Sequence, residues 1–274
     1  MYGKPVADKI KQEVRSFLDF TNYTPELAIV SIGNDPASEV YMRNKLKAAE
    51  ECGIKASKIA LPEDLQMYEY IEALNKASKN YNTVILQLPL PEHLRSFEHL
   101  LTNTINPRVD VDCLTDINIG ILHSNSNMLS YSPCTPAAII DILRYYDIKI
   151  AGKNVVVIGR SNIVGRPVAE MLLQKNATVT ICHTKTKDLK QHTLNADILI
   201  CAAGHKNLIT ADMVKEGVVI VDVSINRDEN GLCGDVDFEN VVPKCYAITP
   251  VPKGVGPVTV AELMNNVSMT RDKE

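Results

Sequence analysis

Five polar residues in the first half of the chain have types and spacings that could do chemistry. Tyr41 and Lys45 are four apart in a segment of helical spacing, so they share one face of the predicted helix. Gln87 ends an apolar segment predicted as a strand, and Asp110 and Asp112 flank Val111 in a DVD motif of a predicted loop. Together they offer a proton-transfer group, an aromatic face, an amide and a carboxylate. A solvated lysine or a simple turn would explain each alone, but all fall near C-terminal ends of predicted strands, where α/β sheets bind ligands.

A second candidate site is the segment GRSNIVG at 159–165, which follows a predicted strand at 154–158. Gly159 starts a tight turn and Gly165 opens a helix, the order in which Rossmann units place a dinucleotide's phosphates on a helix N-terminus. Ser161 replaces the middle glycine of the full GxGxxG pattern, so a plain strand–helix turn remains the alternative. Gly204 ends a later strand at another expected edge of the site, which favours nucleotide binding.

The charges around this turn favour NADP over NAD as the cofactor. NAD sites usually carry an acid at the end of the second strand, but residues 182–184 supply no carboxylate. Arg160 lies in the turn, and Lys185 and Lys187 follow nearby. A guanidinium suits a 2′-phosphate because it offers planar paired donors. The alternative, a solvated Arg160, fits its place between Gly159 and Ser161 less well.

The segment TPVPKGVGPVT at 249–259 is rich in glycine and proline and precedes the last predicted helix. We expect a loop here that lets the backbone approach a ligand closely.

Apolar spacing predicts the elements that position these residues. Val6, Ile10, Val14 and Leu18 recur every four residues, as one face of a first helix requires. Asp35 or Ser38 can cap a later helix that runs to Cys52 and ends at Gly53. The other elements expected in this half are strands at 26–33, 58–62 and 83–88, a helix at 65–79, and a loop-rich stretch from about 103 to 134.

The second half has a more regular alternation. Thr135 and Pro136 suit the start of a helix through about 146, and a last helix is expected at 258–267. Predicted strands at 154–158, 177–182, 197–202 and 218–223 alternate with helices. Unalternated β-branched strands of this kind indicate a parallel sheet covered on both faces. The expected fold class is α/β, with two α/β domains and a cleft between them, the second a Rossmann-like dinucleotide-binding domain. One continuous doubly wound domain is the alternative.

Composition bounds the class of protein. The chain has 274 residues, 45% of them hydrophobic and 23% charged, and a net charge of −4 that gives no reason to expect nucleic acid as a partner. Its seven cysteines are odd in number, dispersed and never spaced CxxC, which argues against disulfides and a structural zinc site. The first residues lack the apolar run of a signal peptide, and no apolar segment is long enough to span a bilayer. We expect a cytoplasmic protein with no membrane partner and no metal.

Seven motifs, taken in order, resemble one enzyme family. They are YxxxK at 41–45, QLPLP at 87–91, DVD at 110–112, PCTP at 133–136, GRSNIVG at 159–165, GDVDF at 234–238 and TPVPKGVGPVT at 249–259. The chain resembles the bifunctional methylenetetrahydrofolate dehydrogenase/methenyltetrahydrofolate cyclohydrolase family over essentially its whole length.

The resemblance implies a folate-binding catalytic domain at 1–134, an NADP-binding Rossmann-like domain at 135–256, and a C-terminal helix at 257–274 that returns to the first domain. It also implies a homodimer and a folate substrate that is oxidised with NADP and then hydrolysed to 10-formyltetrahydrofolate.

The resemblance also assigns roles by motif position. Lys45 matches the catalytic lysine, Tyr41 the tyrosine beside the pterin, Gln87 the residue that orients the lysine, and Asp112 the carboxylate that holds the pterin. The further substrate-binding positions are Leu86, Leu88, Pro250, Pro252, Gly254, Gly256 and Pro257. The cofactor-binding positions are Gly159, Arg160, Ser161, Gly165, Thr184 and Ile225.

Four positions depart from the family's usual residues. Val109 stands where Lys is common, and Cys113, Ser224 and Lys253 stand where Gly is usual. These changes leave two alternatives to the bifunctional enzyme. One is a dehydrogenase that has lost most of its cyclohydrolase activity, and the other is a non-catalytic NADP-sensing binding protein, against which the retained catalytic set counts.

Overall fold

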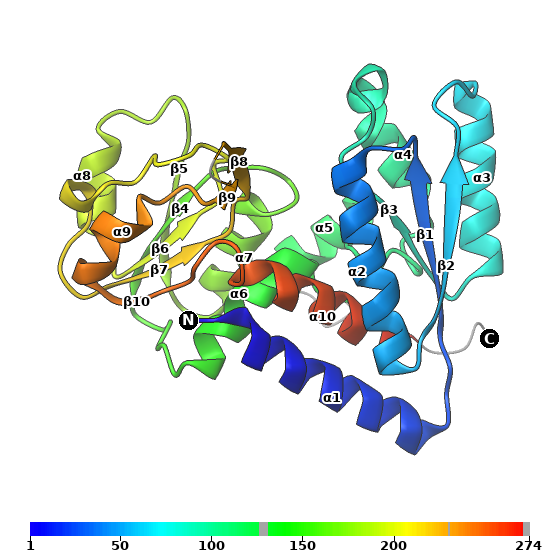
Figure 1. Cartoon of the computed structure of the whole chain (residues 1–274), viewed down its shortest axis with the longest axis horizontal. Helices are drawn as coiled ribbons and strands as arrows, with labels where there is room; N and C mark the ends of the chain where they lie inside the picture. The colour runs from blue at the N-terminus through cyan, green and yellow to red at the C-terminus, as the bar shows by residue number, and fades with distance from the viewer. Residues whose placement is uncertain (126–130, 230, 271–274) are drawn as a thin grey trace. The chain divides into compact units, whose positions relative to one another are not determined.

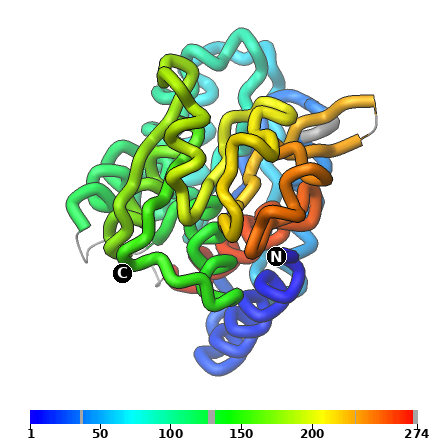
Figure 2. The backbone as a smooth tube through the Cα atoms, turned by 90° about the vertical axis from the view of Figure 1, so that its left-hand side faces the viewer, coloured from blue at the N-terminus to red at the C-terminus, as the bar shows by residue number. Residues whose placement is uncertain are grey.

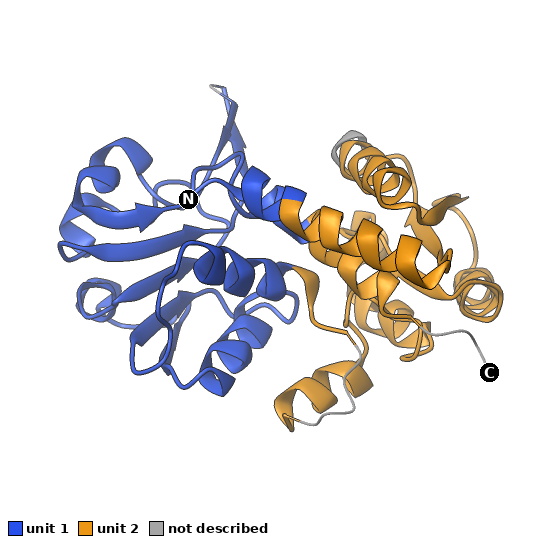
Figure 3. Ribbon diagram, turned by 90° about the horizontal axis from the view of Figure 1, so that it is seen from below, with its two compact units in different colours: residues 1–8, 135–259 blue, residues 9–134, 260–274 orange. Residues whose placement is uncertain are grey.

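The computed structural model describes residues 1–125, 131–229 and 231–270. The chain divides into two compact units (Figure 3). Unit 1 comprises residues 1–8 and 135–259, and unit 2 comprises residues 9–134 and 260–274. The first and last long helices each begin in unit 1 and end in unit 2.

The first eight residues group with unit 1, whereas the sequence predicted one domain from 1 to 134. Hydrogen bonds of the chain's start explain this grouping. The N-terminal ammonium donates to the carbonyl of Ile248 at 2.5 Å, and the Gly3 N–H donates to the carbonyl of Lys253 at 2.8 Å. The N-terminal segment is therefore tied to the last strand of unit 1 and to the turn after it.

Unit 2 is a three-stranded α/β unit (Figure 1). Its strands are β1 (Glu26–Ile32), β2 (Lys55–Leu61) and β3 (Thr83–Leu86). Its helices are α1 (Gly3–Thr21, whose first residues count to unit 1), α2 (Pro36–Cys52), α3 (Met67–Asn80), α4 (Glu98–Thr104) and α5 (Asp116–His123), with the 3-10 helix η1 (Glu92–Phe97).

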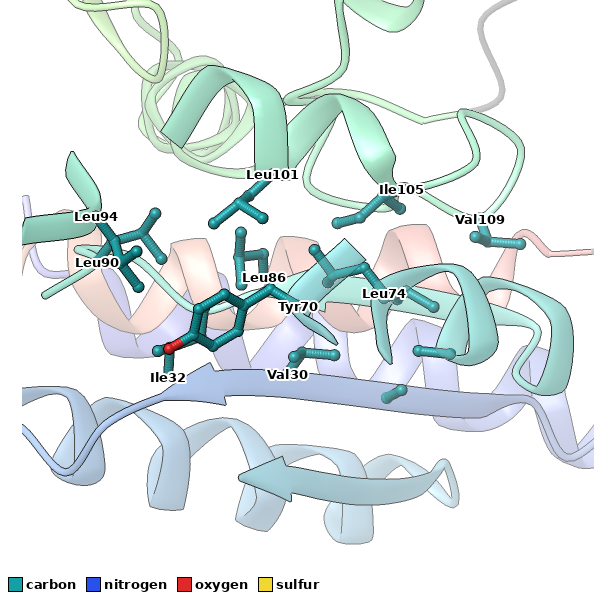
Figure 4. Close-up of a cluster of buried hydrophobic side chains, with 13 residues drawn as sticks. Val30, Ile32, Tyr70, Leu74, Leu86, Leu90, Leu94, Leu101, Ile105 and Val109 are labelled. Carbon is teal, nitrogen blue, oxygen red and sulfur yellow. The ribbon is translucent and has the colours of Figure 1, made fainter. Parts of the chain in front are cut away.

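The strands of unit 2 are parallel and in the order β2-β1-β3. On one face, α3 contributes Tyr70 and Leu74 to a buried cluster with Val30 of β1 and Leu86 of β3 (Figure 4). Leu27 and every second residue after it in β1 point to the opposite face of the sheet. Leu27 is also fully buried. Both faces of the sheet are therefore covered at β1 and β3, which is why these two strands read as nearly continuous apolar runs.

Unit 1 contains the larger sheet. Its strands are β4 (Asn154–Ile158), β5 (Thr178–Cys182), β6 (Ile198–Cys201), β7 (Val218–Asp222) and β10 (Cys245–Ile248), and a separate hairpin is formed by β8 (Asn226–Asp228) and β9 (Gly231–Cys233). Its helices are α6 (Cys134–Tyr145), α7 (Gly165–Gln174), α8 (Leu189–Leu194), α9 (Phe238–Val241) and the start of α10 (Val255–Ser268), with the 3-10 helices η2 (Ala211–Met213) and η3 (Val242–Lys244).

The five strands are parallel and in the order β10-β7-β6-β4-β5. The chain runs from β4 to β5 on one side and then crosses to β6 on the other, so the strand order reverses at β4. This is the doubly wound arrangement whose ligand crevice lies at the C-terminal ends of the strands. The β8–β9 hairpin stands out from the body of the unit (Figure 2).

Most predicted elements are confirmed. The residues spaced by four in α1 are buried, and α2 begins after Asp35 and ends before Gly53, whose φ of 79° is the left-handed helix stop that glycine favours. The predicted strands of the larger sheet match β4 to β7 within one or two residues. Parallel pairing in both sheets confirms the α/β class.

Three expectations about local structure were wrong. The stretch predicted as loop-rich contains the helix α5, in which Gly120 interrupts the apolar spacing. The segment 249–259 is a loop only at its start, because α10 begins at Val255. Pro257 fits the first turn of that helix, where backbone N–H groups have no intrahelical acceptor. The strand β10 was not predicted; three of its four residues are partly or fully exposed, unlike those of the buried strands β3 and β6.

Among the described residues, no helix combines the length and apolar character needed to cross a bilayer. In the same part of the chain, no group of three or more His, Cys, Asp or Glu residues is placed to hold a metal ion.

Candidate functional site

The helix α2 carries the first two candidate residues of unit 2. The Asp35 side chain accepts a hydrogen bond from the Ser38 N–H at 2.8 Å, which satisfies a donor at the helix start. Tyr41 and Lys45 lie one turn apart on this helix. Tyr41 is 40% exposed, and partial burial raises the pKa of its hydroxyl.

Lys45 and Gln87 are joined directly. The Lys45 ammonium donates to the Gln87 Oε1 at 3.0 Å. The Gln87 Nε2 donates to the carbonyl of Leu88 at 2.6 Å, which fixes the amide with its oxygen toward the lysine. The Gln87 N–H also bonds to the carbonyl of Val30 at 2.7 Å, so the residue is held at the C-terminal end of the sheet. The structure therefore brings together two residues 42 positions apart.

The two aspartates of the DVD motif have different environments, although residues two apart lie on the same side of an extended chain. Asp110 is buried and accepts hydrogen bonds from the Thr115 N–H at 2.9 Å and the Asn118 amide at 3.0 Å. Burial raises its pKa, and these donors oppose that effect. Asp112 is half-buried. Asp110 thus holds the loop together, and Asp112 is the more exposed member of the pair.

Lys45 and Asp112 both affect the pKa of one thiol, that of Cys134. Burial is the main cause that raises the pKa of Cys134; the charge and hydrogen bond of Asp112 raise it further, and the charge of Lys45 lowers it. The lysine and the carboxylate therefore lie near the same buried group. Lys45, Gln87 and Asp112 form one polar cluster in unit 2.

Sequence reasoning missed a residue that supports this cluster. Asn266 of α10 is buried, and its side-chain amide donates to the carbonyls of Val111 at 2.8 Å and Ser132 at 2.7 Å. It thereby fixes the backbone next to Asp112. The signal available in the sequence was weak, because Asn266 is one of several polar residues in this helix.

The two leucines beside Gln87 differ in what they can offer a substrate. The Leu86 side chain is buried in the cluster of Figure 4, which leaves its backbone for contact with a ligand. The Leu88 side chain is partly buried and packs against the same cluster.

In unit 1, the turn after β4 is closely packed. Gly159 has a φ of 115°, and a Cβ added there would lie 2.1 Å from the carbonyl oxygen of Ala202, which follows β6. A Cβ at Gly165 would lie 2.3 Å from the carbonyl oxygen of Gly159. Both positions need glycine, because a side chain at either one would collide with neighbouring backbone. The backbone of the turn contacts the end of β6, and the start of α7 contacts the turn.

The other turn residues prepare the start of α7. The Ser161 hydroxyl accepts hydrogen bonds from the N–H groups of Val164 at 3.1 Å and Gly165 at 3.4 Å. The serine that replaces the middle glycine of the Rossmann pattern therefore has a local role. Arg160 is exposed in the same turn.

The end of β5 carries cations and hydroxyls. Thr184, Lys185 and Lys187 are exposed in the loop that follows the strand, and Cys182 is buried at its end. With the exposed Arg160, this edge of the sheet presents positive charge where an NAD site would usually present an acid.

Ile225 is 43% exposed in the segment after β7. Its neighbour Ser224 donates to the buried carboxylate of Asp235 at 2.7 Å and accepts from the Gly204 N–H at 3.0 Å. Asp235 belongs to the motif GDVDF at 234–238, and the motif alone did not indicate a role for it.

The proposed folate segment also belongs to unit 1. Pro250 and Pro252 lie in the turn after β10, and a Cβ at Gly254 would lie 2.5 Å from the Pro250 carbonyl oxygen. Gly256 and Pro257 lie in the first turn of α10.

The four unusual positions have separate physical settings. Val109 is buried in the core cluster of unit 2, where a lysine would lose its hydration. Cys113 and Lys253 have φ values of 57° and 84°, the left-handed region that favours glycine. Ser224 uses its hydroxyl in the two hydrogen bonds described above.

These features define a class: an α/β enzyme scaffold in which one unit holds a lysine–amide–carboxylate cluster and the other a Rossmann-like nucleotide fold. Two family models match the chain: the tetrahydrofolate dehydrogenase/cyclohydrolase catalytic domain over residues 1–112, and the NAD(P)-binding domain of the same family over residues 133–274. The chain belongs to the tetrahydrofolate dehydrogenase/cyclohydrolase family.

Individual relatives agree with this assignment. The bifunctional protein FolD of Methanosarcina mazei is 47% identical over 278 residues, covering 99% of this chain and 95% of that protein. The crystal structure of the bifunctional FolD dehydrogenase/cyclohydrolase from Campylobacter jejuni is 43% identical with a TM-score of 0.93, covering 98% of this chain and 96% of that one. The FolD structure from Trypanosoma brucei, complexed with NADP cofactor and an inhibitor, is 32% identical with a TM-score of 0.92 and the same coverage.

Proposed function

We propose that this protein oxidises methylenetetrahydrofolate to methenyltetrahydrofolate with NADP and hydrolyses the product to 10-formyltetrahydrofolate. The observation that carries the proposal is the Lys45–Gln87 hydrogen bond in a chain of this family. Asp112 lies near this pair, because both Asp112 and Lys45 affect the buried thiol of Cys134. A cation, an oriented amide and a carboxylate are what a pterin-binding site with a proton-transfer step requires.

Lys45 is the proton-transfer group of this proposal. A lysine ammonium has three donors, and Gln87 takes one of them, so two remain for the substrate. Water that adds to the methenyl carbon loses one proton to solvent, and its second proton leaves as the carbonyl of the formyl group forms and the bond from that carbon to one nitrogen breaks. The leaving nitrogen then needs a proton. The Lys45 Nζ holds a proton that it can deliver there, while Gln87 limits the directions in which the ammonium points.

Asp112 binds and orients the substrate. Its carboxylate can accept paired hydrogen bonds from the amino group and a ring N–H of the pterin. Asn266 and Asp110 fix the loop on both sides of it. A fixed carboxylate limits the poses of the pterin ring, which provides the orientation that both reactions need.

The residues of unit 1 fit a dinucleotide with a 2′-phosphate. The backbone of the 159–165 turn packs too closely for any side chain at its two glycines, as expected where a backbone approaches phosphates. Arg160, Lys185 and Lys187 are exposed cations beside it, and Thr184 adds a hydroxyl. When bound, NADP supplies the hydride acceptor, and these residues bind and orient it.

The hydrolysis role is tested with Lys45→Met, which keeps the length of the stem and removes the charge. We expect loss of methenyltetrahydrofolate hydrolysis with NADP affinity unchanged within twofold. Lys47→Met, on the exposed side of the same helix, is the matched control and should behave like the wild type. Wild-type hydrolysis rates in Lys45→Met would overturn the role of Lys45.

Cofactor choice is tested with Arg160→Ala. Loss of a guanidinium beside a 2′-phosphate should weaken NADP binding at least tenfold and NAD binding less than twofold. Lys175→Ala, at the other end of α7, is the control. Equal losses for the two cofactors would exclude Arg160 as the 2′-phosphate ligand.

A dehydrogenase with little cyclohydrolase activity is the second candidate. The strained backbone of Cys113, next to Asp112, favours it, because that strain bears on the loop that presents the carboxylate. Separate assays of NADPH formation and methenyl hydrolysis by the purified protein decide between the two candidates.

Two further proposals concern the setting of the enzyme. The seven cysteines are free thiols, which supports a reducing compartment such as the cytoplasm. A homodimer is supported by the edge strand β5, which within the described part of the chain pairs with β4 alone and exposes Ile181, and by the exposed Leu173 of α7. Ile181→Lys should then give a monomer in analytical ultracentrifugation, whereas Phe20→Lys, at another exposed apolar side chain, should not. A dimer that survives Ile181→Lys would exclude β5 as its interface.

A further inference from the structure

The carboxylate of Asp235 is fully buried and accepts five hydrogen bonds. Three come from successive backbone N–H groups of residues 203–205, at 2.7, 3.2 and 2.8 Å. The other two come from the Ser224 hydroxyl at 2.7 Å and the Asn226 side-chain amide at 3.0 Å. A carboxylate has about four lone-pair directions, so these donors saturate it.

The two segments that Asp235 joins lie at the ligand-binding edge of the sheet. Residues 203–205 follow the C-terminal end of β6, and residues 224–226 follow that of the neighbouring strand β7. In a doubly wound sheet a dinucleotide lies across the point where strand order reverses, with one mononucleotide half on each side. Here the reversal is at β4. The 2′-phosphate cations are on the β5 side, so the β6 and β7 side is left for the nicotinamide half.

The hydrogen bonds hold the irregular backbone after β6 and the segment that leads from β7 into β8. Gly204 has a φ of 68°, and its N–H is shared between Asp235 and the Ser224 hydroxyl. Ser224 and Asn226 are both tied to Asp235, so Ile225 between them presents its side chain outward. Asp235 therefore sets the conformation of two loops at once.

Asp235 is itself held by a second buried carboxyl group. The Asp222 side chain accepts hydrogen bonds from the N–H groups of Asp235 at 3.1 Å and Val236 at 3.0 Å. A Cβ at Gly234 would lie 1.9 Å from the Asp222 Oδ2, so this backbone fits only with glycine at 234. The connection that carries Asp235 is thus anchored to the end of β7.

We propose that Asp235 is a positioning residue for the nicotinamide half of the cofactor site, acting through segments 203–205 and 224–226. The assignment rests on the proposed function and deepens it. Loops fixed in one conformation bind the nicotinamide half without first being ordered, and they hold it in the alignment that hydride transfer needs. In this chain Ser224 adds a hydroxyl bridge between the two loops.

The test compares the affinity for NADP with that for 2′,5′-ADP, which carries only the adenosine half and the 2′-phosphate. Asp235→Asn keeps the shape of the side chain but turns an NH₂ group toward the N–H donors. We expect the Kd of NADP to rise at least tenfold and the Kd of 2′,5′-ADP to stay within twofold. Calorimetry is suitable because the chain has no Trp to report binding. The KM for NADP should rise while the KM for the folate substrate stays unchanged.

Two more variants keep the test decisive. Ser224→Ala removes one donor from a half-buried site, so it should fold and raise the Kd of NADP about threefold, again without an effect on 2′,5′-ADP. Asp237→Asn makes the same chemical change two residues along, at a carboxylate that accepts from the Asn240 amide, and should change neither affinity.

The outcomes separate this proposal from the proposed function. Equal losses of NADP and 2′,5′-ADP affinity in Asp235→Asn and Ser224→Ala, or no loss of either, would overturn the positioning role while leaving NADP as the cofactor. A wild-type protein that binds neither NADP nor 2′,5′-ADP would overturn the cofactor assignment itself.

Discussion

The substitution Lys253→Gly should make the protein more stable. Lys253 has a φ of 84° in the turn between Pro252 and Gly254, and its side chain is exposed. An L-residue in the left-handed region costs roughly 1–2 kcal/mol, because its Cβ crowds the carbonyl oxygen. Glycine removes that cost but adds about 0.5–1 kcal/mol of backbone entropy to the unfolded chain.

The net gain follows from these two terms, since an exposed side chain loses no packing when it is removed. We expect Lys253→Gly to raise the free energy of unfolding by about 0.5–1 kcal/mol, and Tm by roughly 1–3 °C for a chain of this size. The hydrogen bond that the Lys253 carbonyl accepts from the Gly3 N–H involves backbone alone and should survive.

Lys253→Ala is the matched control, because it removes the ammonium and the stem but keeps the Cβ that causes the strain. Its stability should equal that of the wild type within about 0.5 kcal/mol. The three proteins are compared by calorimetry at one scan rate and concentration, since the Tm of a chain that aggregates on unfolding depends on the scan rate. If the glycine variant were no more stable than the alanine variant, backbone strain at this position would be refuted.

Three further substitutions test other parts of the structure. Cys113→Gly relieves a similar strain, but Cys113 is buried, so the lost packing should outweigh the gain and destabilise by about 1 kcal/mol in the same scans. Ser161→Ala removes the acceptor at the start of α7 and should cost about 1 kcal/mol in urea unfolding and weaken NADP binding; unchanged values for both would contradict the role of this hydroxyl. Burial raises the pKa of Asp222 to about 7, above its unfolded value, so its contribution to stability is complete below about pH 4 and is lost as pH rises through 7. Asp222→Asn should abolish that part of the pH dependence, of order 4 kcal/mol, in urea unfolding measured from pH 4 to 8; an unchanged profile would contradict it.

The parts of the fold that the sequence predicts are those set by local rules. The four-residue spacing in α1, the glycine stop at Gly53 and the apolar runs of β1 and β4 each depend on neighbours within a few positions, and all are confirmed. The start of α10 was misjudged because glycine and proline disfavour a helix interior but are tolerated in its first turn.

The parts that could not be predicted depend on partners far apart in the chain. Asn266 bonds to the Val111 carbonyl across 155 positions, and Asp235 collects donors from segments up to 32 positions away. No spacing rule connects such residues, because only the folded chain brings them together. Motif position suggested that Gln87 orients Lys45, and the hydrogen bond between them supports that role.

The pattern DVD occurs twice, at 110–112 and 235–237, and both copies have the same pattern of burial. In each, the first aspartate and the valine are buried while the second aspartate is half-buried. In an extended chain, residues two apart share one face, so alternation alone does not predict that one carboxylate turns inward and the other does not. The hydrogen-bond donors close in space decide which aspartate is buried. Asp110 accepts hydrogen bonds from Thr115 and Asn118, and Asp235 accepts them from the N–H groups of residues 203–205. A buried carboxylate needs such donors, so the inner aspartate shapes the loops. At 110–112 this leaves Asp112, the outer carboxylate, as the group that can meet a substrate.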